Sequence, residues 1–262
     1  MRRHLLTAAV ALVLLFLLAP LAVSLIVSFN AEPNMAFPPH EWGFRWYLNF
    51  FQRRQFQEAL GFTVKLALAA TATSTVCGSC LAVVMAQDRL KLRRVLEWVV
   101  PLPIFVPEVV TGLALLTLLS RLHLGMGFTT LWIAHVIITL PYVTYTSLVS
   151  MRAFDQDLAN AARGLGAGYW RTLWTIVLPI IKPGIASGAI FAFLLSFDNL
   201  MISSFLLSPL QTTLPVEVSM YIRTKSDPTV AAIASLLMLS TAFGVVIINR
   251  LFGLEKLLKI QG

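Results

Sequence analysis

Three ionisable side chains, Lys65, Glu108 and Asp198, lie inside long apolar runs of this sequence. A charge inside a membrane is costly, so it usually lines an aqueous cavity or pairs with a partner. Two carboxylates beside an aqueous path would attract a cationic amine. For Asp198 and Glu108 this interpretation competes with a structural ion pair or a helix cap. Lys65 would either pair with a carboxylate or extend to the membrane surface.

The remaining reactive residue types do not form a recognisable catalytic or metal pattern. Intramembrane hydrolysis needs a nucleophile with a base, paired aspartates, or a metal-binding His-Glu-x-x-His, and none of these is present. Cys77 and Cys80 form a C-x-x-C inside an apolar stretch, where small residues packing a helix contact are favoured over zinc or redox chemistry. His123 and His135 lack ligand spacing, which predicts packed or interfacial histidines.

The composition places these residues in a membrane protein. The 262 residues are 58% hydrophobic and 12% charged, with a mean hydropathy of +0.80. Soluble domains carry about 25% charged residues, so this chain has too little polar surface for a water-soluble fold. The net charge of +8 arises from basic residues between the apolar runs, which indicates cytoplasmic loops rather than a nucleic-acid surface.

Six apolar segments reach the length of about 20 residues that a spanning helix requires. They are Leu5–Ser28, Leu60–Ala86, Val99–Leu119, Phe128–Ser150, Leu178–Phe205 and Val230–Leu251. With a cytoplasmic N-terminus, thirteen of the twenty Lys and Arg residues fall on the cytoplasmic side. The sequence therefore predicts an all-α integral membrane protein with six transmembrane helices and both termini in the cytoplasm.

The predicted cytoplasmic loop 151–177 has an unusual pattern. Asp155 is a plausible N-cap, and Asp157 favours the first turn of a short helix. Small alanines follow, and Gly164, Gly166 and Gly168 then break the helix. An amphipathic stretch leads from this bend into the next span. A short helix held outside the membrane by a glycine bend can insert into a groove on another protein.

The spacing in this loop matches a cytoplasmic signature of ABC importer permeases, which is Glu-Ala-Ala, three residues, Gly, nine residues, then Ile-x-Leu-Pro. The matching residues are Asn160, Ala161, Ala162, Gly166, Ile176, Leu178 and Pro179. The chain thus resembles the permease subunit of a bacterial type I ABC importer. The resemblance implies that 160–166 is a coupling helix that docks on a separate ATPase. Asn160 stands where the family has Glu, so an acidic contact is lost there.

Other tracts resemble the second permease subunit of spermidine/putrescine importers. They include Ser28-Phe29-Asn30, Pro107-Glu108-Val109-Val110, Leu140-Pro141-Tyr142-Val143 and the run from Ser196 to Phe205. The resemblance implies a translocation path involving Asp198, Asn199, Glu108 and Ser203. Polyamine permeases tend to carry two adjacent acidic residues where this chain has Asp198-Asn199. A quaternary amine, an amino acid derivative or a phosphonate is therefore an alternative substrate to a polyamine.

The resemblance also implies the partners: two copies of an ATP-binding subunit, a second homologous permease, an extracytoplasmic solute-binding protein and membrane lipid. The chain has no Gly-x-x-x-x-Gly-Lys-Ser/Thr loop, so it is expected to bind no cofactor, with ATP and Mg on the ATPase. The expected organisation is a first helix and outer loop (1–56), a five-helix permease core (57–252) and a cytoplasmic tail (253–262). A stand-alone channel or an intramembrane enzyme are the rival functions.

Overall fold

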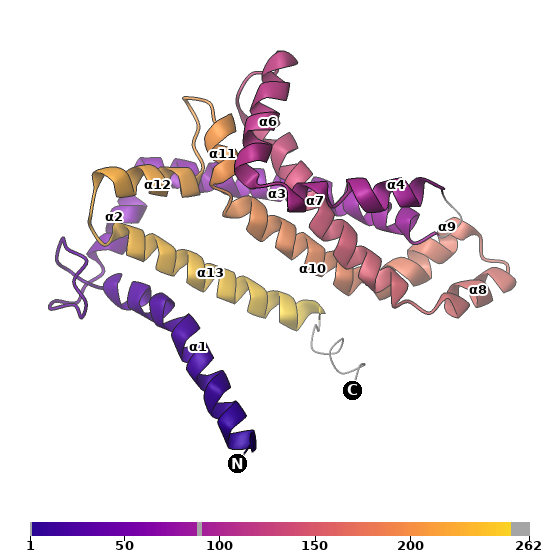
Figure 1. The fold of residues 1–262 in the computed structure, drawn as a ribbon, viewed down its shortest axis with the longest axis horizontal. Helices are drawn as coiled ribbons and strands as arrows, with labels where there is room; N and C mark the ends of the chain where they lie inside the picture. The colour runs from indigo at the N-terminus through magenta and orange to yellow at the C-terminus, as the bar shows by residue number, and fades with distance from the viewer. Residues whose placement is uncertain (1, 88–90, 253–262) are drawn as a thin grey trace. The chain divides into compact units, whose positions relative to one another are not determined.

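The computed structural model describes residues 2–87 and 91–252, and this part of the chain is almost entirely helical (Figure 1). The helices fall into two compact units. One unit contains the residues up to Glu58 together with Glu217–Leu251, and the other contains Ala59–Val216. The predicted tail, 253–262, lies outside the described residues.

The first unit contains α1 (Arg2–Val27), α2 (Arg45–Gln52), most of α12 (Leu214–Thr224) and α13 (Thr229–Phe252). Almost every residue of α1 is exposed, which is typical of a helix whose surroundings are lipid or another subunit. After α1 the chain is fixed by Trp46, whose indole Nε1–H donates to the Asn30 carbonyl oxygen at 2.6 Å. Trp46 is therefore a packing residue, whereas Trp42 is exposed.

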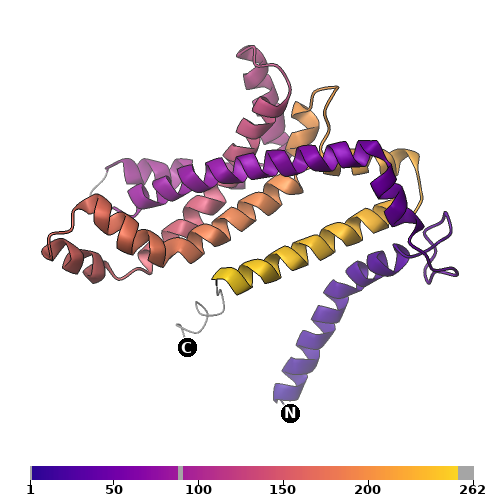
Figure 2. The same ribbon diagram turned by 180° about the vertical axis from the view of Figure 1, so that it is seen from behind.

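The second unit is built around the antiparallel pair α7 (Phe128–Arg152) and α10 (Leu178–Phe197), which lie side by side in both views (Figures 1 and 2). Two glycines of α10 permit this close approach. A Cβ at Gly188 would lie 2.8 Å from the Val143 Cα, and one at Gly184 would lie 2.9 Å from the Thr146 carbonyl oxygen. Small residues at helix contacts let two backbones approach closely within a membrane.

Helix α3 (Arg54–Met85) extends along this pair in Figure 2. It approaches α7 closely at Gly78, where an added Cβ would lie 2.9 Å from the Val143 Cβ. The flanking Cys77 and Cys80 are exposed free thiols. The expectation that these cysteines pack a helix contact is therefore wrong within this chain, because the glycine between them makes the contact.

Two of the predicted spans are broken in the structure. The segment expected at Val99–Leu119 begins at the end of α4 (Lys91–Val99) and contains α5 (Leu102–Phe105) and most of α6 (Glu108–Arg121). The chain bends by 107° between α5 and α6. Prolines at 101, 103 and 107 explain the breaks, because proline removes a helical hydrogen bond and disfavours a helical residue before it. The predicted span Leu178–Phe205 ends as α10 at Phe197, and α11 (Met201–Leu206) follows a break.

Four helices of the described chain are long and apolar enough to cross a bilayer: α1, α3, α7 and the continuous helix Tyr169–Phe197. The bent α4–α6 region adds a fifth span if its parts count as one. In α13 the apolar stretch with described side chains covers only Thr229–Ala242. The count of six spans and the cytoplasmic termini stay predictions.

Candidate functional site

The first candidate region is the loop between α7 and α10, which contains α8 (Gln156–Gly164), α9 (Tyr169–Thr172) and the π-helical turn η1 (Leu173–Val177). The predicted cap is confirmed, since a carboxylate oxygen of Asp155 accepts the backbone N–H of Asp157 at 2.9 Å. This bond satisfies one of the free N–H groups that begin any helix. The loop therefore starts with a locally encoded helix.

A glycine turn folds α8 back onto the start of the next span. Gly166 has a φ of +87°, in the region that favours glycine, and Leu165 before it is 89% exposed. On the inner face, Ala159 packs with Val177 and Ile181 in one cluster. Ile176 and Leu178 of the signature pack against this cluster, while Pro179 is exposed at the second position of α10. Ile176 and Leu178, near the end of the signature, therefore pack beneath α8.

The outer face of α8 carries the polar and small residues of the signature. Asn160 and Ala161 are exposed, and Ala162 is half-buried. The amide oxygen of Asn160 accepts from the guanidinium of Arg163 at 2.9 Å. Asn160 therefore keeps a hydrogen bond to Arg163 but supplies no negative charge. This face is small-sided and available to another protein.

The second candidate region is a polar cluster among α6, α7, α10 and α11. Asn199, which is 6% exposed, lies in the break between α10 and α11. Its amide nitrogen donates to the Glu108 carboxylate at 3.1 Å. Its amide oxygen accepts the backbone N–H groups of Ile202 and Ser203 at 3.0 and 3.3 Å. One side chain thus joins the start of α6 to the start of α11.

His135 of α7 completes this cluster from the other side. Its ring is fully buried, with Nδ1 2.7 Å from the Ser196 hydroxyl and Nε2 3.2 Å from the Ser203 hydroxyl. The hydroxyl of Thr139 donates to the His135 carbonyl oxygen at 2.7 Å. The prediction of a packed histidine is confirmed. Its role as a link between α10 and α11 was missed, because its partners are 61 and 68 residues away.

Asp198 is separated from the cluster. It is exposed, and among the described residues its side chain has no hydrogen-bond or ion-pair partner. Lys65 is likewise exposed on α3, without a carboxylate partner in the described part of the chain. Of the four path candidates, the structure therefore brings Glu108, Asn199 and Ser203 together and leaves Asp198 apart.

A small cavity of about 80 Å³ adjoins Glu108. Thr111 and Tyr142 supply its other polar groups, and Ile138 and Leu195 supply apolar walls. Within the described residues, no group of three His, Cys, Asp or Glu side chains could hold a metal ion. The chemistry that this region offers is the attraction of a cationic or hydrogen-bonding group.

A third polar group lies within the first unit, around the segment that joins α12 to α13. Tyr221 donates its hydroxyl hydrogen to Asp227 at 2.7 Å, and the Thr229 backbone N–H donates to the same carboxylate at 3.0 Å. Burial acts to raise the pKa of Asp227, but the hydrogen bonds and the nearby Arg53 outweigh it and lower that pKa. Arg53 also lies 5.1 Å above the Tyr221 ring. These contacts fix the segment before α13.

Comparison with known proteins identifies relatives along most of the chain. The putrescine transport system permease protein PotI of Escherichia coli K12 is 32% identical over 230 residues, covering 85% of this chain and 82% of that protein. The spermidine/putrescine transport system permease protein PotC of Haemophilus influenzae is 27% identical over 237 residues, covering 90% of this chain and 91% of the relative.

Solved structures show the same fold at low sequence identity. A bacterial ABC transporter involved in importing the acidic polysaccharide alginate matches with a TM-score of 0.75 and 17% identity, covering 96% of each chain. The MetNI methionine ABC transporter matches with a TM-score of 0.60 and 15% identity, covering 77% of this chain and 96% of that one. The predicted ABC importer permease fold is therefore confirmed.

The family model for the "binding-protein-dependent transport system inner membrane component" matches residues 78–253, which include loop 151–177 and the polar cluster. Permease subunits of this family are inner-membrane proteins and are not themselves enzymes. On the evidence of this match, the relatives and the shared fold, the chain belongs to that family and is a permease subunit of a type I ABC importer.

Proposed function

We propose that this permease carries a polyamine, delivered by an extracytoplasmic binding protein, across the inner membrane. The observation that supports this substrate is the Glu108 carboxylate, which lies beside a cavity and is oriented by a neutral amide, Asn199, rather than by a basic residue. Its negative charge is thus available to an amine. The names of the relatives PotI and PotC point to the same substrate class.

In this proposal Glu108, Asn199, Ser203 and Asp198 contribute to the path with different roles. Glu108 attracts the ammonium groups, while Asn199 and Ser203 hold the broken helix beside it. Asp198, exposed at the end of α10, faces either the path or the second permease. Both carboxylates act transiently, since tight binding within the path would slow release.

The assembly we propose has two ATP-binding subunits, a second homologous permease and the binding protein, with ATP and Mg held by the ATPase subunits and none by this chain. The exposed face of α8 around Asn160, Ala161 and Ala162 docks on the ATPase. Gly166 sets the angle of α8, and Ile176, Leu178 and Pro179 connect it to α10. Closure of the ATPase subunits on ATP would then move α10 and open the path outward.

The test is the ATPase activity of the reconstituted complex with its binding protein, against a panel of polyamines, betaines, amino acids and phosphonates. Polyamine stimulation is expected. Glu108→Gln and Asp198→Asn should each raise the apparent KM for the polyamine, by roughly fivefold for loss of one partly solvated charge pair. Glu41→Gln, at an exposed carboxylate in the chain after α1, is the matched control. Stimulation by a zwitterion or an anion alone would contradict the polyamine assignment and leave family membership intact.

A further inference from the structure

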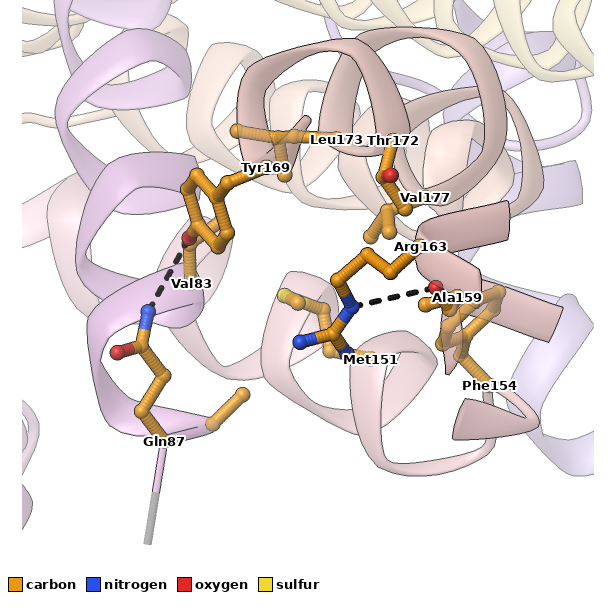
Figure 3. Close-up of a pocket in the computed structure, with 11 residues that line it drawn as sticks. Val83, Gln87, Met151, Phe154, Ala159, Arg163, Tyr169, Thr172, Leu173 and Val177 are labelled. Carbon is orange, nitrogen blue, oxygen red and sulfur yellow. Dashed lines mark hydrogen bonds between the residues drawn. The ribbon is translucent and has the colours of Figure 1, made fainter. Parts of the chain in front are cut away.

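A second and larger cavity, of about 510 Å³, lies behind loop 151–177, which we call the coupling loop after its proposed function (Figure 3). Its walls come from the end of α3, the end of α7, the inner face of α8, and α9 with η1. All of these elements belong to the second unit. The volume falls within the range of about 300–1,000 Å³ that is typical of sites for organic ligands. The importer mechanism outlined above assigns no role to this cavity.

Polar side chains, one of them positively charged, form part of the cavity lining. Figure 3 shows the Arg163 guanidinium projecting into it from α8, opposite the hydrogen bond between Gln87 and the Tyr169 hydroxyl. The bonds that Arg163 makes go to neutral acceptors, the Ala159 carbonyl oxygen at 3.2 Å and the Asn160 amide oxygen at 2.9 Å. Among the described residues no carboxylate pairs with Arg163. The cavity therefore holds a cation that is not neutralised.

Most of the remaining lining of the cavity is apolar. The residues that form it are Val83, Ala86, Met151, Phe154, Leu173 and Val177. A fully water-soluble anion would gain nothing from this wall, and an uncharged hydrocarbon would gain nothing from Arg163. The charged group of an amphipathic anion would pair with Arg163, and its hydrocarbon part would contact the apolar residues.

The position of the cavity indicates where such an anion would come from. The cavity lies where the candidate spans α3 and α7 end. Beside it, Trp170 and Trp174 are one helical turn apart and are 70% and 67% exposed. Exposed tryptophans at the end of a span are typical of the headgroup layer of a bilayer. The cytoplasmic leaflet also contains anionic lipids that attract basic groups.

We propose that this cavity binds an anionic phospholipid of the cytoplasmic leaflet. The phosphate accepts hydrogen bonds from Arg163 and Gln87, and the glycerol and upper acyl chain contact the apolar wall. A lipid in this position lies between α8 and the ends of α3 and α7, so its occupancy stiffens the coupling loop. The inference rests on the cytoplasmic position that the proposed function gives to the loop.

Lipid binding can be measured separately from transport by native mass spectrometry of the purified complex in phosphatidylglycerol or phosphatidylethanolamine. We expect the wild-type complex to retain phosphatidylglycerol preferentially. Arg163→Gln should lower this retention roughly fivefold, the usual effect of one basic group near an anionic membrane. Asn160→Glu should lower it similarly, because a carboxylate would then neutralise Arg163. Arg171→Gln, a basic residue of the same loop outside the cavity, should retain the lipid.

A second pair of variants tests the apolar wall. Ala86→Phe would fill the cavity and should expel the lipid, whereas Ala153→Phe, at an exposed position outside it, should not. Equal retention of both lipids by the wild type would overturn the proposal, as would retention of phosphatidylglycerol by both Arg163→Gln and Ala86→Phe. Displacement by millimolar glycerol phosphate would show a soluble phosphate site and overturn the lipid assignment. Polyamine-stimulated ATPase activity in the same samples reports the proposed function independently.

Discussion

The coupling loop and the membrane polar cluster are organised in opposite ways. In α8 and its cap the polar bonds are local, such as Asp155 to Asp157 and Arg163 to Asn160, and these polar residues are exposed. In the cluster the bonds join distant parts of the chain, with Asn199 and Glu108 separated by 91 residues, and His135 and Asn199 are buried. Helix α8 is thus a surface helix defined by its own sequence, whereas the cluster exists only when four helices assemble.

This difference has consequences for stability and for function. A buried polar group that loses its partner costs about 1–3 kcal/mol, because no water replaces the lost bond. An exposed polar residue loses little when it is changed, since water takes the place of its partner. Changes in the cluster should therefore reduce the free energy of unfolding, whereas changes in the loop should reduce coupling and leave the fold intact.

The largest expected effect is that of His135→Ala. The change leaves the Ser196 and Ser203 hydroxyls without the ring nitrogens and opens a cavity, so the free energy of unfolding should fall by about 2–4 kcal/mol. Thermal unfolding of the purified complex measures this loss. Thr144→Val is the control, because buried Thr144 bonds only its own helix at the Leu140 carbonyl oxygen. Equal losses from the two changes would show that the bonds of His135 between helices contribute no more to stability than the bond of Thr144 within its own helix.

Asn199→Asp sharpens the contrast by adding charge to the cluster. The new carboxylate would still accept the N–H groups that begin α11, but it would face Glu108 at about the 3.1 Å of the present bond. Repulsion should destabilise the substrate-free complex by about 1 kcal/mol. A polyamine should restore that stability in a thermal shift assay. Asn199→Ala, which adds no charge, should show no such rescue, and rescue of both variants would argue against charge as the cause.

In the loop, Gly166→Ala should impair coupling without unfolding the protein. Alanine at a φ of +87° costs about 1–2 kcal/mol, which would shift α8 away from its docking angle. The rate of ATP-driven uptake into proteoliposomes should fall roughly fivefold to tenfold. Gly164→Ala is the matched control two residues earlier, at the end of α8, where an added Cβ would meet no atom within 4 Å. If both variants transport normally, the angle set by Gly166 does not matter.

The smallest expected effect is on the pH dependence of stability, through Asp227 in the segment between α12 and α13. The pKa of Asp227 is lower in the folded protein than its usual value, so this carboxylate contributes stability at neutral pH. That contribution is lost as the pH falls through the lowered pKa, and it should amount to less than about 1 kcal/mol for a partly exposed group. Asp227→Asn should therefore reduce stability at pH 7, and this reduction should shrink as the pH is lowered. A difference that persists unchanged at pH 3 would contradict the assignment.

The amino-acid sequence by itself determined the membrane class, the family and the local structure of loop 151–177. Apolar runs report membrane helices directly, and the loop signature depends on spacing within about twenty residues. The cap at Asp155 and the glycine turn at Gly166 are equally local, so their positions could be read from neighbouring residues. Asp198 and Glu108 could be recognised as unusual, but the sequence alone made them appear as a pair of equivalent carboxylates.

Only the tertiary structure decided which of these groups meet. It joined Glu108 to Asn199, left Asp198 apart, and made His135 the link between α10 and α11. It also showed that Gly78 rather than Cys77 or Cys80 makes the contact with α7. The physical reason is that membrane helices are uniformly apolar on every face, so hydropathy does not indicate which face packs. Close contacts at small residues and long-range hydrogen bonds specify the packing instead.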